Sequence, residues 1–136
     1  FHPGGKLGAK LLKVADLMHS GDAIPLVAEG MPMGDVLLEM SRKGFGVAGV
    51  TDGAGRLSGI VTDGDLRRHM DGLLSRTAAE VMTRSPKTVA PGAVAEKAVA
   101  LMKDRAITCL FVVDPDGDGQ AAGILNIHDC LRAGVV

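Results

Sequence analysis

The chain has 136 residues, of which 46% are hydrophobic, and its formal net charge is -1 at pH 7. This length and apolar content are sufficient for one compact domain. Acidic and basic residues are interspersed, so there is no broad basic field, and this excludes nucleic-acid binding through the neutralisation of phosphates. No run approaches 18 apolar residues, so no membrane-spanning segment is predicted.

The two cysteines and the N-terminal residues bear on the cellular setting. Cys109 and Cys130 lie in apolar segments and lack the spacing of a metal knuckle or a disulfide framework. They are therefore predicted to be reduced core residues of a cytoplasmic protein. The chain begins at Phe1 without an initiating Met, and its first residues lack the features of a signal peptide. We expect a piece of a longer protein that begins at a domain boundary.

The first half of the chain predicts the element order β-α-β-β-α. Val36, Leu37 and Met40 recur at helical spacing, and Asp52 to Gly55 is a turn of the hairpin type. The predicted ranges are a strand at 24–27, a helix at 33–45, strands at 47–51 and 57–62, and a helix from residue 63 through Met70.

The second half repeats this order about 64 positions later. Asp16-Leu17-Met18 returns as Glu80-Val81-Met82, and Gly59 to Thr62 with Asp65 returns as Gly123 to Asn126 with Asp129. The predicted ranges are a strand at 88–89, a helix at 93–106, strands at 109–113 and 122–126, and a helix at 127–133; the final Val135-Val136 has no predicted partner. Two copies are too few for a solenoid and indicate a pseudo-symmetric pair.

The segment Gly59 to Asp65 allows two interpretations. Thr62 ends a strand and precedes a helix, so its hydroxyl and the following backbone N–H groups converge on a space that fits a phosphate, and Asp65 is placed to accept from ribose hydroxyls. The same Thr-x-x-Asp spacing is also a capping box, in which the two side chains satisfy each other's backbone N–H groups.

Three other patterns are rejected as ligand motifs. Gly44 to Gly49 matches GxGxxG, but it follows a helix and enters a strand, so it is interpreted as a helix stop. The segment 114–119 begins like an EF-hand loop but has Leu125 at the twelfth position, and it is predicted to be a hairpin turn. The four histidines are far apart in sequence, and no metal site is predicted.

The tandem β-α-β-β-α units, each with glycine, two aliphatic residues, Thr or Ser, and a later Asp, resemble the cystathionine β-synthase (CBS) domain pair over residues 14–135. The resemblance implies an α/β (α+β) fold of tandem CBS repeats packed by pseudo-twofold symmetry as one Bateman-type module. The predicted boundaries are a lead-in at 1–13, CBS repeat 1 at 14–73, a connection at 74–78 and CBS repeat 2 at 79–136.

In the CBS family the clefts between repeats often bind adenine nucleotides, so the resemblance also implies ligand sites. Because the chain has no Trp or Tyr, recognition of a base would be aliphatic. The predicted ligand-binding residues are Ile24, Val27, Val47, Thr62, Asp63, Gly64, Asp65 and Arg68. The residues of a weaker second site are Thr88, Cys109, Asn126 and Asp129, where Asn126 departs from the Thr or Ser of the family. Arg67, His19 and Arg84 are further candidates for positive charge near a phosphate.

A narrower resemblance comes from Phe1 to Gly8, Val14 to His19 and Gly59 to Arg68, which together look like the C-terminal portion of bacterial D-arabinose 5-phosphate isomerases of the KpsF/GutQ type. Such proteins carry an N-terminal sugar isomerase (SIS) domain that interconverts D-ribulose 5-phosphate and D-arabinose 5-phosphate for Kdo and lipopolysaccharide synthesis. The resemblance implies that catalysis lies upstream, with His2 as the one contributor from this chain.

The functional expectation is a non-catalytic regulatory CBS pair that senses a nucleotide or nucleotide sugar. The expected effectors are AMP, ATP or CMP-Kdo, and no cofactor is required. The expected partners are its own SIS domain and a second copy in a homodimer formed through the CBS pairs, with higher oligomers of the full-length protein. Two alternatives stay open, namely a structural dimerisation module without a ligand and a stand-alone adenine-nucleotide sensor.

Overall fold

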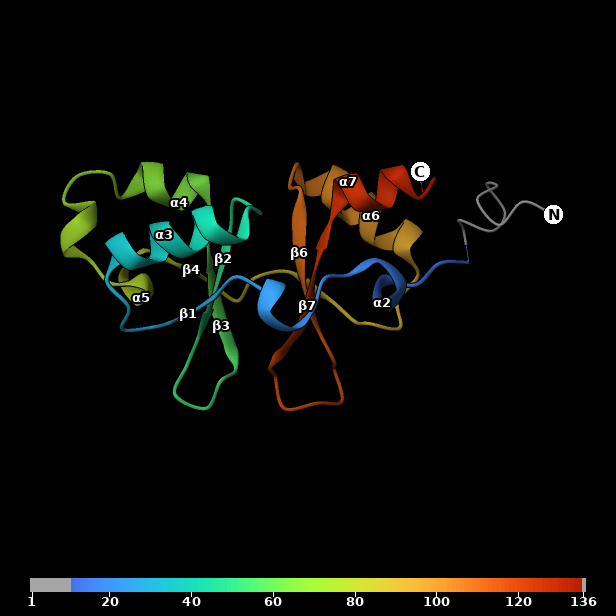
Figure 1. Cartoon of the computed structure of the whole chain (residues 1–136), viewed down its shortest axis with the longest axis horizontal. Helices are drawn as coiled ribbons and strands as arrows, with labels where there is room; N and C mark the ends of the chain where they lie inside the picture. Colours follow the sequence, from blue (N-terminus) through green and yellow to red (C-terminus); the bar gives the residue numbers. More distant parts are fainter. Residues whose placement is uncertain (1–10, 136) are drawn as a thin grey trace. The chain divides into compact units, whose positions relative to one another are not determined.

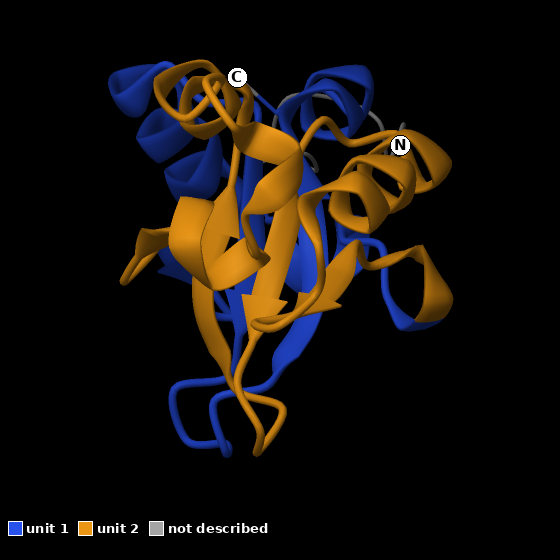
Figure 2. Cartoon of the chain, turned by 90° about the vertical axis from the view of Figure 1, so that its left-hand side faces the viewer, with its two compact units in different colours: residues 1–21, 87–136 blue, residues 22–86 orange. Residues whose placement is uncertain are grey.

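The computed structural model describes residues 11–135, which form two compact units (Figure 2). Unit 2 is one continuous segment, residues 22–86, whereas the described part of unit 1 joins residues 11–21 to residues 87–135. Each unit has its own sheet and its own hydrophobic core.

Unit 2 contains a four-stranded sheet covered by helices (Figure 1). The strand order is β1-β2-β3-β4, in which β1 and β2 are parallel and the other neighbours are antiparallel. The strands are β1 (Leu26–Ala28), β2 (Ala48–Thr51), β3 (Leu57–Val61) and β4 (Thr83–Arg84). The helices are η1 (Gly21–Ala23, at the unit boundary), α3 (Met33–Lys43), α4 (Asp63–Arg68), η2 (Leu73–Ser75) and α5 (Ala78–Val81).

Helix α3 shows how the sequence pattern produces this unit. Its buried residues Met33, Val36 and Met40 recur every three or four positions and face the sheet, where they join a core with Val27. The helix ends at Gly44, which has a φ of 79° and donates its backbone N–H to the Met40 carbonyl. The GxGxxG segment is therefore confirmed as a helix stop.

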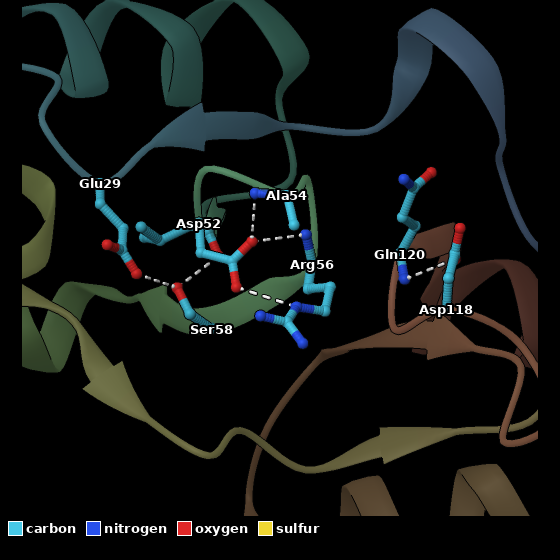
Figure 3. A network of polar contacts seen from close by, with 8 residues as sticks. Glu29, Asp52, Ala54, Arg56, Ser58, Asp118 and Gln120 are labelled. Atoms are coloured by element: carbon cyan, nitrogen blue, oxygen red, sulfur yellow. Dashed lines mark hydrogen bonds and ion pairs between the residues drawn. The ribbon is translucent and has the colours of Figure 1, made fainter.

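The hairpin between β2 and β3 is held by the side chain of Asp52 (Figure 3). Its Oδ1 accepts from the backbone N–H groups of Ala54 at 2.9 Å and Arg56 at 3.0 Å, and its Oδ2 accepts from Arg56 Nε at 3.1 Å. The backbone N–H of Arg56 is the largest of the influences that hold the pKa of Asp52 below its usual value. Close by, the Ser58 hydroxyl lies 2.8 Å from a carboxylate oxygen of Glu29 and ties β3 to the loop after β1.

Unit 1 contains a three-stranded sheet of the same kind. The strand order is β5-β6-β7, with β5 and β6 parallel and β6 and β7 antiparallel. The elements are α2 (Val14–Leu17), β5 (Thr88–Val89), α6 (Ala95–Arg105), β6 (Cys109–Val113), β7 (Ala121–Asn126) and α7 (Ile127–Arg132). The acidic segment 114–119 joins β6 to β7 and is confirmed as a hairpin turn.

The compact units do not follow the sequence copies. Helix α2 lies at the start of the first copy, yet it belongs to unit 1, where the backbone N–H of Val14 donates to the Ala93 carbonyl at 2.8 Å. Its counterpart α5 lies at the start of the second copy, yet it belongs to unit 2, where the N–H of Ala78 donates to the Met31 carbonyl at 2.9 Å. Each unit therefore contains one short helix from the start of the other copy.

Several predictions of local structure need correction. Val135 has a partner after all, because it is 3% exposed in the core of unit 1 and its N–H donates to the Cys130 carbonyl. Cys130 is in that core as predicted, whereas Cys109 is only partly buried. Strand β1 begins after Pro25, which has no N–H to give to a ladder. Helices α2 and α5 and strand β4 were not predicted.

Candidate functional site

A cluster of polar side chains lies in unit 2 where β3 meets α4; we call it the Asp65 cluster, and it consists of Thr62, Asp65, Arg68 and Thr83. Asp65 Oδ2 accepts from the backbone N–H of Thr62 at 2.9 Å and from its hydroxyl at 3.0 Å. Asp65 Oδ1 accepts from Arg68 Nη2 at 2.5 Å and from the Thr83 hydroxyl at 2.6 Å. Thr62 Oγ1 in turn lies 3.4 Å from the Asp65 N–H, so the capping-box interpretation is confirmed.

Asp65 is a buried charge with every acceptor position in use. It is 2% exposed, and a carboxylate offers about four lone-pair positions, which is the number of donors that it receives. Burial raises its pKa, but the hydrogen bonds from Thr83, Thr62 and Arg68 together outweigh burial and hold the pKa of Asp65 below its usual value. The carboxylate is therefore ionised and fixed at neutral pH.

The equivalent group in unit 1, which we call the Asp129 cluster, consists of Asn126, Asp129, Arg132 and His19. His19 Nε2 donates to Asp129 Oδ2 at 2.6 Å, because a carboxylate only accepts, and Arg132 Nη2 donates to Oδ1. Asn126 caps α7 differently from Thr62, since its side chain accepts from the N–H of His128 at 2.7 Å. The two clusters therefore share a carboxylate and an arginine but differ in their caps.

The repeat motifs require glycine at positions 59 and 123, because a side chain there would clash with neighbouring atoms. A Cβ on Gly59 would lie 2.5 Å from Met82 Sδ and 2.8 Å from the Thr83 carbonyl oxygen. A Cβ on Gly123 would lie 2.6 Å from Met18 Sδ and 2.8 Å from the carbonyl oxygen of His19, the residue that bridges to Ile124. Only glycine lets these backbones approach, and this approach places Thr83 and His19 beside the two carboxylates.

The structure brings together part of the predicted first site. Thr62, Gly64, Asp65 and Arg68 are neighbours, because a Cβ on Gly64 would lie 3.6 Å from Thr62 Oγ1 and 3.3 Å from Arg68 Nη1. Asp63 is exposed on the first turn of α4. The three predicted aliphatic walls, Ile24, Val27 and Val47, are buried. Val27 belongs to the core cluster of unit 2, so its role as a wall stays a prediction.

The predicted second site is brought together in part as well. The Sγ of Cys109 lies 3.6 Å from Asn126 Nδ2, and burial is the main cause that raises the pKa of this thiol. Asn126 and Asp129 lie on the same strand-to-helix junction. Thr88 is exposed on β5, opposite Phe111 of β6.

Three residues that contact the carboxylates were not among the predicted site residues. Thr83 was missed, Arg132 was missed, and His19 was named only as a source of positive charge near a phosphate. The repeat itself carried the signal, because Arg132 follows Arg68, and Thr83 follows His19, by the same spacing that separates Asp65 from Asp129. His2 lies outside the described residues.

Residues 11–135 contain neither a metal-binding cluster nor a membrane-spanning helix. This part of the chain holds no group of three or more His, Cys, Asp or Glu residues arranged to bind a metal ion. Within the same range, no helix has both the length and the apolar character needed to cross a membrane.

Known proteins resemble this chain along its whole length. It is 48% identical to the arabinose 5-phosphate isomerase KdsD of Pseudomonas aeruginosa and 45% identical to KdsD of Escherichia coli K12, in both cases over 99% of the chain. The chain spans only 42% of the length of these relatives.

Solved structures show the same fold. The structure of CBSX2 in complex with AMP is 27% identical with a TM-score of 0.77, over 90% of this chain and 96% of that one. The cytosolic domain of the Mg2+ channel MgtE in complex with ATP is 28% identical with a TM-score of 0.73, over 88% of this chain and 48% of that one. A sequence model of the CBS domain matches residues 9–72 and 78–136, so the chain belongs to the CBS domain family and carries a pair of these domains.

Proposed function

We propose that this CBS pair is the regulatory part of an arabinose 5-phosphate isomerase and that it senses an adenine nucleotide. The observation that carries the proposal is the 48% identity to an isomerase of this name over 99% of the chain. The choice of ligand is supported by the structural relatives, whose structures contain AMP or ATP. CMP-Kdo has no comparable support and serves as a competing ligand in the tests below.

In this proposal the isomerisation of D-ribulose 5-phosphate and D-arabinose 5-phosphate, for Kdo and lipopolysaccharide synthesis, belongs to a SIS domain outside the chain. The CBS pair acts on that domain by binding a nucleotide with different affinities in two states of the protein. We further propose a homodimer through the CBS pairs, higher oligomers of the full-length protein and a cytoplasmic setting.

Kinetics of the full-length isomerase test the regulatory part of the proposal. Its kcat and KM for arabinose 5-phosphate are measured with AMP, with ATP, with CMP-Kdo and without any of them. We expect an adenine nucleotide to change one of these constants and CMP-Kdo to leave both unchanged. Identical kinetics in all four conditions would contradict a regulatory role.

The phosphate position can be tested at Gly64, next to Thr62 and Arg68. A Gly64→Ala substitution would place a methyl group 3.3 Å from Arg68 Nη1, in the space proposed for the phosphate. The matched control is Gly34→Ala in α3, where a Cβ would have no neighbour within 4 Å. We expect Gly64→Ala to weaken AMP binding several-fold relative to Gly34→Ala. Equal affinities would place the phosphate elsewhere.

A structural dimerisation module is the second candidate function, and the state of Asp65 favours it. A buried carboxylate with all acceptor positions filled behaves as a support for the fold. This candidate predicts a stable dimer by sedimentation and no change in thermal stability with any nucleotide. A nucleotide that raises the melting temperature would exclude a purely structural role.

A further inference from the structure

Helix α3 has an exposed face that the core of unit 2 does not use. Asp35, Leu38 and Arg42 are all exposed, and their spacing of three and four positions places them on one side of the helix. Leu38 is 61% exposed, and two further large apolar side chains of unit 2, Met70 and Leu74, are 61% and 70% exposed. Leu74 belongs to η2, which packs against α3. Several large apolar side chains exposed on neighbouring helical segments are typical of an interaction surface.

The charges on this face of α3 complement one another when the face meets a copy of itself. Asp35 lies in the first turn of the helix, Arg42 lies in the last turn, and Leu38 is midway between them. If two α3 helices pack antiparallel about a two-fold axis at Leu38, Asp35 of each copy lies opposite Arg42 of the other. A two-fold axis makes such a contact occur twice, so one helix face supplies two attractive pairs.

The side chain of Arg42 has donors to spare for such a contact. Its Nη1 donates to Glu39 Oε1 at 3.0 Å within the helix, and the side chain of Arg42 is nevertheless 70% exposed. A guanidinium has five N–H donors, so the bond to Glu39 leaves others for a second carboxylate.

The equivalent face of α6 in unit 1 has the opposite order of charges. Position 35 corresponds to Lys97, position 38 to Ala100 and position 42 to Asp104, and all three residues are exposed. The repeat thus keeps the spacing of the face but exchanges its acid and its base. It also replaces the large apolar residue at the centre by a methyl group.

This reversal restricts how α3 can meet another helix. An antiparallel contact of α3 with α6 would place Asp35 opposite Asp104 and Arg42 opposite Lys97, and both pairs repel. A parallel contact with α6 would match the charges. However, it would bury Leu38 against a single methyl group, whereas the contact of α3 with another α3 buries two leucines against each other.

We propose that α3 is a contact surface for a second copy of this chain. Two α3 helices pack antiparallel about a two-fold axis at Leu38, with Asp35 of each copy paired with Arg42 of the other. The inference rests on the proposed function, which includes a homodimer, and it deepens that proposal by naming the face and its orientation. The specific occupant is α3 of the second copy, because only that helix offers both matching charges and a leucine at the centre.

Sedimentation of the whole chain over a range of concentrations tests the two charge pairs. Asp35→Arg places two arginines opposite each other, and Arg42→Asp does the same with two aspartates. We expect each variant to dimerise about tenfold more weakly than the wild type, because repulsion replaces attraction at two symmetric positions. The double variant Asp35→Arg/Arg42→Asp should recover most of the wild-type affinity. Asp116→Arg, in the exposed turn after β6, is the matched control and should leave dimerisation unchanged.

The double variant also distinguishes the two possible helix partners. Against a second α3 its charges match again, whereas in a parallel contact with α6 they would face Lys97 and Asp104, so that both pairs repel. An equimolar mixture of the two single variants gives the same distinction, because a heterodimer through α3 has two attractive pairs. We therefore expect the mixture to dimerise more strongly than either variant alone.

Oxidative crosslinking provides a second measurement that does not depend on reversed charges. A residue on a two-fold axis faces itself, so Leu38→Cys should form a disulfide-linked dimer readily. Ser41→Cys, which is exposed on the same helix but away from this face, and the wild-type chain should crosslink much less. Circular dichroism confirms that each variant folds.

The outcomes distinguish this inference from the homodimer on which it rests. If the wild-type chain is monomeric at every concentration, the proposed homodimer fails and the inference fails with it. If the wild type dimerises but the single charge variants do so equally well, or if the double variant is the weakest of all, the contact through α3 is wrong while the homodimer stands. A lack of crosslinking through Leu38→Cys in a dimeric chain would also contradict the inference.

Discussion

At the scale of single residues, the aspartate of the repeat motif has a different environment in the two repeats. Asp65 is buried and receives four hydrogen bonds, whereas Asp129 is partly exposed and receives two from described residues. The difference in the number of hydrogen bonds comes from the capping residue. Thr62 donates to Asp65 from both its backbone N–H and its hydroxyl, whereas the side chain of Asn126 accepts from the N–H of His128. The residue at the cap position thus changes how many hydrogen bonds the motif carboxylate receives.

Asp65→Asn should lower the free energy of unfolding by about 3 kcal/mol, because it removes the charge that receives four hydrogen bonds in a buried position. Asp63→Asn, on the exposed face of the same helix, should cost less than about 0.5 kcal/mol. Urea unfolding at pH 7 measures both values. Equal stabilities of the two variants would show that the network contributes little.

The lowered pKa of Asp65 also predicts how stability depends on pH. The folded protein holds this pKa below the value of about 3.9 expected in the unfolded chain, so the unfolded state takes up the proton first as the pH falls. The stabilisation is complete above about pH 5 and is lost progressively through pH 4 and below. Unfolding measured from pH 7 to pH 3 should therefore show a steeper loss in the wild-type chain than in Asp65→Asn; parallel curves would refute the assignment.

At the scale of elements, the glycine of each repeat motif lets a neighbouring segment reach the strand. Gly59→Ala would force Met82 and the Thr83 backbone away from β3, and we expect it to lower the unfolding free energy by about 1 to 3 kcal/mol. Gly123→Ala should do the same in unit 1, where Met18 and the His19 backbone are the obstacles.

The matched control for both glycine variants is Gly92→Ala, at which an added Cβ meets nothing within 4 Å. It should change stability by no more than about 0.5 kcal/mol. Thermal or urea unfolding of the three variants provides the measurement. If Gly59→Ala and Gly92→Ala had the same stability, the close approach of β4 to β3 would not be the reason for the glycine.

The elements that the sequence predicts best are those with several periodic residues. Helices α3 and α6 each span eleven residues with apolar positions at helical spacing, and the hairpins have alternating strands around a turn, so their approximate positions could be derived. Helices α2 and α5 have four residues each and β4 has two, which is too short for a pattern. Tertiary hydrogen bonds, such as Val14 to Ala93, hold these short elements in place instead.

At the scale of the whole molecule, each unit contains one short helix, α2 or α5, from the start of the other sequence copy. The sequence showed that Asp16-Leu17-Met18 and Glu80-Val81-Met82 are equivalent, but it did not show in which unit each would lie. The sequence likewise could not show which distant residues contact the two motif carboxylates. Thr62 and Asp65 are close in sequence and could be paired, whereas His19 and Asp129 are 110 positions apart and are joined only by folding.

Val14→Ala tests the placement of α2. Val14 is fully buried in the core of unit 1, so the substitution should lower the unfolding free energy by about 2 kcal/mol. Ala15 is exposed on the same helix, and Ala15→Ser should cost less than about 0.5 kcal/mol. Urea unfolding of both variants gives the comparison. A Val14→Ala chain as stable as the wild type would mean that the segment 11–21 does not pack in unit 1.

The central claim is that this CBS pair binds an adenine nucleotide, and a thermal unfolding series of the chain with increasing AMP tests it most directly. A ligand at a hundredfold excess over its dissociation constant stabilises the folded state by about 2.7 kcal/mol, which corresponds to a rise of several degrees in melting temperature. We predict a rise that saturates with AMP concentration and is smaller with CMP-Kdo at equal concentration. A melting temperature that is unchanged at every AMP and ATP concentration would contradict the account.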